Sequence, residues 1–158
     1  MTYFHEEQRF GRWVWAVLAI ISVPVIVAAI SVAGRDPAGL AAILVGPIVV
    51  AVITALFALA KLVTDVDGRG IHVSFHLLWP TRHIPLQDVQ RAHATEYSPL
   101  VDYGGWGVRL SWKGWAFNTG GAEGVLVETK RGQRVMVGSR RAKELEAAIA
   151  KAMAARPA

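Results

Sequence analysis

Residues 13–34 read WVWAVLAIISVPVIVAAISVAG and residues 37–60 read PAGLAAILVGPIVVAVITALFALA, and neither stretch contains a charged residue. An α-helix rises about 1.5 Å per residue, so roughly 20 apolar residues cross the hydrocarbon core of a bilayer. Both stretches reach that length, and a helix is required because lipid offers no hydrogen-bond partner to exposed peptide groups. The sequence therefore predicts two transmembrane helices, 13–34 and 37–60.

The connection between these stretches predicts how the two helices run. Gly34 can end the first helix with a positive φ, and Pro37 suits the first turn of the second. Only Arg35 and Asp36 lie between them. So short a connection predicts an antiparallel hairpin, with both ends of the chain on the same side of the membrane.

The distribution of basic residues predicts which side that is. Arg9 and Arg12 flank the first helix and Lys61 and Arg69 follow the second, whereas an aspartate offsets the single arginine of the connection. Because cytoplasmic segments carry the excess of Lys and Arg, we expect both termini in the cytoplasm, at the plasma (inner) membrane. A cleaved signal peptide is the alternative for the first helix, but glutamates precede it and its apolar core is long.

Composition agrees with this division of the chain. Apolar residues make up 53% of the 158 residues, and nearly all of the excess over an ordinary soluble domain lies before Lys61. Seventeen basic residues against 12 acidic ones give a net charge of +5, which suits an anionic partner or a cytoplasmic membrane segment. The chain has no cysteine, which excludes disulfides, thiolate metal sites and cysteine nucleophiles. We divide it into a cytoplasmic N-terminal segment, 1–12, the hairpin, 13–60, and a domain, 61–158.

The domain after the hairpin has the pattern of a β structure closed by one helix. Residues 62–66 and 71–75 alternate apolar with polar side chains around an Asp-Gly turn, which predicts a β-hairpin. Gly132 supplies the positive φ of a second tight turn. About seven strands fit between Leu62 and Gly138. Ser139 can cap a final helix, which carries one apolar face: Ala142, Leu145, Ala148, Ile149, Ala152 and Met153.

Six stretches of the sequence carry a resemblance: 4–10, 67–73, 82–89, 103–107, 125–139 and 143–145. Together with the order of strands followed by a single terminal amphipathic helix, they resemble a pleckstrin-homology-like domain of the bacterial type. The whole chain resembles small prokaryotic membrane proteins in which a two-helix hairpin precedes such a domain. The resemblance implies an α+β fold, a PH-like barrel or sandwich of about seven strands capped by a helix. It supplies no activity and no ligand residue.

Aromatic residues near a glycine-rich stretch are the candidates for binding a protein partner. Tyr103 precedes a group of glycines that let a partner approach closely, and Trp106 lies among them. Trp112 and Trp115 follow. The alternative is that the glycines form a bend with Trp106 in the core, and that the residues around Lys113 form a hairpin turn.

A group of basic residues near the last strand is the candidate for binding an anionic lipid headgroup. Each cation near a membrane surface contributes about 1 kcal/mol to such binding. Two of them also precede a helix N-terminus, where positive charge is unfavourable unless an anion is present. The alternative is a solvated surface, and nucleic acid is an improbable partner because no recognition motif occurs. The residues are Lys130, Arg131, Arg134, Arg140 and Arg141.

Nothing in the sequence predicts catalysis, a cofactor or a metal site. His72 and His76 lie two pleats apart on one strand, too far to bind one metal without another element. No serine lies in a nucleophile elbow, and the glycines around Trp106 lack the spacing of a phosphate loop. A membrane-associated enzyme is therefore the third alternative, after binding of a protein and binding of a lipid.

We thus expect a non-enzymatic, membrane-anchored binding or scaffold module that assembles with a protein partner or with a second copy of itself. Small residues four apart in the second helix, Ala42 with Gly46 and Ala51 with Ala55, suit close packing between helices. They serve either an oligomer or the contact between the two helices of one hairpin.

Overall fold

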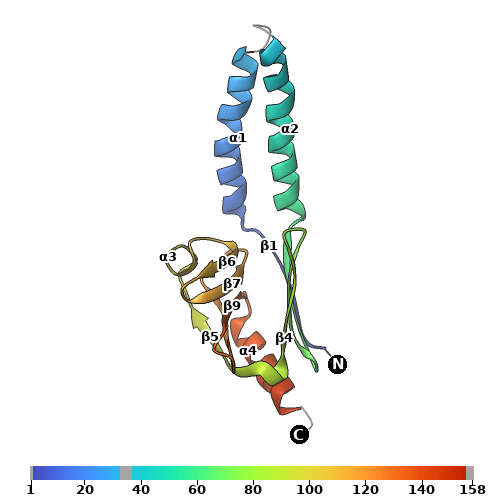
Figure 1. Cartoon of the computed structure of the whole chain (residues 1–158), viewed down its shortest axis with the longest axis vertical. Helices are drawn as coiled ribbons and strands as arrows, with labels where there is room; N and C mark the ends of the chain where they lie inside the picture. Colours follow the sequence, from blue (N-terminus) through green and yellow to red (C-terminus); the bar gives the residue numbers. More distant parts are fainter. Residues whose placement is uncertain (1, 33–36, 156–158) are drawn as a thin grey trace. The chain divides into compact units, whose positions relative to one another are not determined.

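The computed structural model describes residues 2–32 and 37–155, and in the second helix it describes side chains from Val45 onward. The predicted helix end at Gly34 and the connection at Arg35 and Asp36 lie outside these residues. Residues 10–59 form one compact unit. The residues before Phe10 and after Leu59 together form the other, so the second unit is built from both ends of the chain (Figure 1).

The first unit is a pair of helices that lie side by side, α1 (Arg12–Val32) and α2 (Pro37–Leu59) (Figure 1). Pro37 begins α2, as predicted. Gly46 is the point of close approach, because a Cβ there would lie 3.4 Å from Cγ1 of Val25 on α1. Ala51 and Ala55 are exposed in the single chain. Of the two predicted roles for the small residues, Gly46 has the one within the hairpin.

The length and composition of α1 suit a membrane span. In the part of the chain that the structure describes, Arg12–Ser31 is the one helix long and apolar enough to cross a membrane. The described side chains of α2 add a shorter apolar stretch, Val45–Leu59. Since α1 lies near the N-terminus, a signal sequence would pass the same test.

The first sheet of the other unit is an antiparallel meander of four strands. Its order is β1 (Thr2–Arg9), β2 (Lys61–Asp67), β3 (Gly70–His76) and β4 (Trp79–Pro85). The predicted hairpin is confirmed as β2 and β3, and alternate residues of β2 are buried. Strand β1 was not predicted: the segment before the helices pairs with β2 along its whole length.

The second sheet has five strands in the order β5-β8-β9-β7-β6, and only the contact between β7 and β9 is parallel. The prediction of about seven strands between Leu62 and Gly138 is corrected to eight between Lys61 and Gly138. The elements in chain order are η1 (Leu86–Asp88), β5 (Val89–Glu96), α3 (Pro99–Tyr103), β6 (Gly107–Ser111), β7 (Gly114–Asn118), β8 (Glu123–Thr129) and β9 (Arg134–Gly138).

Helix α4 (Ala142–Ala154) closes the unit and contacts β1 and β2 of one sheet and β5 and β8 of the other (Figure 1). Its predicted apolar face is confirmed, since five of the six residues are buried; Met153 is half-buried. The largest fully buried side chains come from both sheets and this helix, including Phe75, Phe117 and Leu145. The core therefore lies between the two sheets with α4 covering one side.

The prediction that Ser139 caps α4 is wrong, and the reason lies in β1. The helix begins three residues later, at Ala142. The Ser139 hydroxyl donates to the Glu6 carboxylate (2.6 Å) and accepts from the backbone N–H of Arg141 (3.0 Å). The backbone N–H of Arg140 also donates to Glu6 (3.2 Å). The two arginines before this helix N-terminus would be unfavourable without an anion nearby, and Glu6 supplies that negative charge.

Strand β1 is held in place by a second buried polar side chain, Gln8. Its amide donates to the backbone carbonyl of Gly138 (2.8 Å), and its oxygen accepts from the Thr119 hydroxyl (3.3 Å). Both Glu6 and Gln8 are buried. Because buried polar groups are costly unless they are hydrogen-bonded, these contacts fix β1 of the first sheet to the ends of β7 and β9 in the second.

Candidate functional site

The glycine-rich stretch forms the end of a short helix and a sharp bend. Helix α3 ends at Tyr103, where Gly104 adopts a left-handed conformation (φ 71°) and its N–H bonds the carbonyls of Leu100 and Pro99. Gly105 (φ 133°) and Gly107 (φ 103°) also have positive φ. Three positive φ angles within four residues require glycine, so the bend leading from α3 into β6 accounts for this part of the sequence.

The structure places the four candidate partner-binding residues in different environments. Tyr103 is buried and packs edge-on against Tyr97, with ring centroids 5.8 Å apart. Trp115 is half-buried between the rings of Trp79 (5.9 Å) and Phe117 (6.3 Å). Trp106 is half-buried. Only Trp112, at 85% exposure, stands free on the surface of the described unit.

Trp112 lies on a hairpin turn that two contacts hold in place. Strands β6 and β7 pair up to Ser111 and Gly114, which confirms the turn predicted around Lys113. The Lys113 ammonium pairs with Asp102 of α3 and lies over the Trp112 ring at 5.0 Å. That lysine, and then the backbone N–H of Ser98, lower the pKa of Asp102 against a smaller opposing effect of burial. The ion pair therefore joins the turn to α3.

Further apolar side chains surround this turn. Leu100 and Val101 of α3 and Leu110 of β6 are exposed, Val101 by 82% of its surface. Helix α3 contacts β6, so these residues belong to one part of the molecule. We call Leu100, Val101, Leu110 and Trp112 the hairpin surface. An exposed apolar cluster of this kind marks an interaction site more often than isolated exposed residues do.

The basic residues do not form one surface. Lys130 and Arg131 lie in the turn before β9, Arg134 begins that strand, and Arg140 and Arg141 lie beyond its end. Five residues of strand separate them by about 17 Å. Arg134 pairs with Glu128 (3.2 Å), and Arg141 pairs with Glu144 (3.4 Å) and donates to the His5 carbonyl. Adjacency in sequence thus did not predict adjacency in space.

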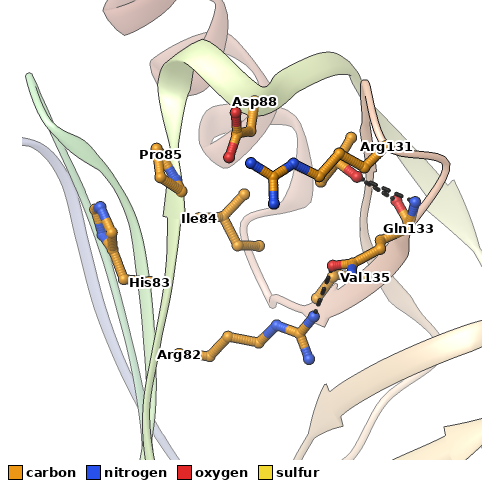
Figure 2. Close-up of a pocket in the computed structure, with 9 residues that line it drawn as sticks. Arg82, His83, Ile84, Pro85, Asp88, Arg131, Gln133 and Val135 are labelled. Carbon is orange, nitrogen blue, oxygen red and sulfur yellow. Dashed lines mark hydrogen bonds between the residues drawn. The ribbon is translucent and has the colours of Figure 1, made fainter.

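A small pocket of about 90 Å³ lies between β4 and the β8–β9 turn (Figure 2). Arg82 donates to the Gln133 side chain (3.3 Å) and lies 5.1 Å from the centre of the Trp115 ring, and burial lowers its pKa. Figure 2 shows the guanidinium of Arg131 directed toward Asp88. The pocket thus already contains a carboxylate opposite one of its two arginines, which weakens it as an anion site.

His72 has a close histidine partner on another strand, which the sequence did not predict. His72 and His83 are partners across β3 and β4, with their Nδ1 atoms 3.2 Å apart. His72 Nε2 lies 3.3 Å from Asp67. Within residues 2–32 and 37–155, no three histidine or carboxylate side chains are grouped as metal ligands would be.

Sequence reasoning missed two features that bear on binding. One is β1, with its buried Glu6 and Gln8. The other is the turn between β3 and β4, where Leu77, Leu78 and Trp79 are all exposed. The signal for the turn was present in the sequence as adjacent large apolar residues between two strands.

Comparison with known proteins adds no relative. No protein-family model matches the chain, and no curated protein matches it.

Proposed function

We propose that this chain is a membrane-anchored binding module, with a PH-like β unit that assembles with a protein partner at the inner face of a prokaryotic plasma membrane. Three observations support this proposal. They are the pairing of β1 with β2, the strand order of the β unit, and the hairpin surface.

The pairing of β1 with β2 supports a two-span anchor. Arg9 at the end of β1 faces Lys61 at the start of β2, so the two residues lie on the same side of any membrane. The chain between them must then cross an even number of times: both helices cross, or neither does. The apolar α1 favours crossing. Cleavage after α1, as for a signal sequence, would remove β1 together with Glu6 and Gln8.

The strand order supports the PH-like expectation. The four-stranded meander β1-β2-β3-β4 is followed by β5, β8 and β9 and then by α4. These seven strands and one helix match the number of strands and the terminal helix that the resemblance implies, whereas the resemblance places the helical hairpin before the first strand. The helical hairpin is then an insertion between the first two strands, and α3 with the β6–β7 hairpin is an insertion between the fifth and sixth.

The observation that carries the binding function is the exposure of Trp112 on a turn fixed by the Lys113–Asp102 ion pair. Tryptophan is enriched among the residues that dominate binding energy at interfaces. Strand β7 pairs with β9 and buries Phe117, but the turn between β6 and β7 lies at the surface, so the core does not require an aromatic residue at position 112. The basic residues lie in two groups at opposite ends of β9, and Arg134 and Arg141 are paired with glutamates. We therefore favour a protein partner over a lipid headgroup.

Site-specific photocrosslinking in cells tests this proposal. A photoreactive residue at position 112 of the full chain should give a discrete protein adduct, and Leu110→Asp on the same surface should abolish it. The matched control is the same photoreactive residue at position 69, an exposed position on the β2–β3 turn. Absence of a protein adduct at position 112, or equal adducts at both positions, would contradict the proposal.

A further inference from the structure

The turn between β3 and β4 presents three large apolar side chains to the surroundings. Leu77, Leu78 and Trp79 are exposed by 57%, 39% and 45%, and we call them the leucine turn. Leu77 has a positive φ of 68°, the only such angle at a non-glycine residue in the described chain. Glycine or asparagine suits this conformation, and leucine is strained in it.

Neither the strain nor the exposure of Leu77 is explained by folding in water. An exposed leucine gains nothing from burial, and its backbone angle is unfavourable. Both features are accounted for if the side chain enters an apolar environment. The turn therefore points to a hydrophobic partner outside the β unit.

The strand register locates that partner. His76, the residue before the turn, is paired with Lys61, and Lys61 is paired with Arg9. Neighbouring strands lie about 5 Å apart, so the leucine turn is one to two strand spacings from both of these residues. Arg9 leads to α1 through Phe10 and Gly11, and α2 leads to Lys61 through Ala60. The leucine turn thus lies at the end of the sheet from which the chain enters both helices.

The residues at this end of the sheet suit the boundary between lipid and water. Tryptophan and basic residues are enriched at that boundary, and this end combines Trp79 with Arg9 and Lys61. The opposite end of the same sheet is polar. Its β2–β3 turn contains Asp67, Gly68 and Arg69, and the Asp67 carboxylate accepts from the backbone N–H of Arg69 (2.8 Å). Of the two ends of this sheet, the one joined to the helices carries the exposed large apolar side chains.

We infer that the leucine turn enters the interfacial layer of the bilayer that the hairpin crosses. The sheet is then held at the membrane at three points: Arg9, Lys61 and this turn. The inference rests on the anchoring in the proposed function. The ligand is the lipid surface, and the turn supplies the apolar contact while Arg9 faces the headgroups beside Lys61, whose ammonium is paired with Glu7 (2.8 Å).

The natural absence of cysteine permits a direct test in the full chain. Single variants Leu77→Cys, Arg69→Cys and Ile20→Cys carry a nitroxide label in nanodiscs of neutral and anionic phospholipid. All three positions are exposed in the structure, so the labels leave the fold intact. Accessibility to oxygen, which concentrates in lipid, is compared with accessibility to a water-soluble nickel chelate by electron paramagnetic resonance.

The label at position 77 should collide with the nickel chelate several-fold less often than the label at position 69. The label at position 20 should lie in the acyl chains. If position 20 is in lipid but position 77 is as exposed to the chelate as position 69, the inference is overturned and the anchor stands. If position 20 is itself in water, the anchor fails and the inference fails with it.

Discussion

Arg9 and Lys61 face each other across β1 and β2, and the entire helical unit lies between them in the sequence. The helices therefore occupy the place of a β-turn. This arrangement makes the N-terminal strand part of the same fold as the C-terminal helix, and it keeps both ends of the inserted unit together.

Replacing residues 10–60 by Asn-Gly should give a folded, water-soluble β unit. Arg9 and Lys61 are already paired, and Asn-Gly forms the two-residue turn that joins antiparallel strands. Circular dichroism and size-exclusion chromatography without detergent measure the result. Residues 61–158 alone are the control: they lack β1, and we expect them to unfold or aggregate. Equal stability of the two proteins would show that β1 is dispensable.

Glu6→Ala in this soluble variant should lower the free energy of unfolding by about 2 kcal/mol, because the Ser139 hydroxyl and the Arg140 N–H lose a charged partner. Chemical denaturation provides the measurement. Glu7→Ala is the matched control, since Glu7 lies on the opposite face of β1 and is exposed. A loss for Glu7→Ala as large as that for Glu6→Ala would contradict the role of the buried network.

Asp102 should stabilise the fold in a pH-dependent way. Lys113 and the Ser98 N–H lower its pKa in the folded protein, so its stabilising contribution is complete above the unfolded value of about 3.9. It is lost as the pH falls through the lower, folded value. The difference in Tm between the parent and Asp102→Asn should therefore be constant near neutral pH and shrink in acid. A difference that is unchanged throughout would contradict the ion pair.

Tyr97 should titrate late, because burial raises its pKa to about 12. The unfolded value is about 10, so its contribution to stability is complete below that pH and is lost as the pH rises toward the folded value. Phenolate absorbance follows the titration, and Tyr97→Phe should remove its last step. A step at the ordinary value for this residue would show that the ring is solvated.

The sequence predicted elements whose side chains follow a period and failed where they do not. β2, β3 and α4 bury regularly spaced apolar residues, and all three were predicted. In β1 the inward positions include Glu6 and Gln8, whose partners lie more than a hundred residues away. Strand β4 is an edge strand with few buried residues, so its pattern carried little information.

The candidate site was predicted in part for the same reason. Trp112 was identified as a candidate, but nothing local distinguished it from Tyr103, which the fold places in the core. Arg131 and Arg140 are near in sequence, yet β9 runs between them and separates them. Residues at the two ends of one strand are close in sequence but far apart in space. The strand pairings that bring distant residues together depend on the whole fold.

Extraction of cell membranes with alkaline carbonate tests the anchor, on which the location of every other surface depends. The full chain should remain in the pellet and enter solution only with detergent, whereas the variant with Asn-Gly in place of residues 10–60 should be in the supernatant. Recovery of the full chain in the carbonate supernatant would contradict the account.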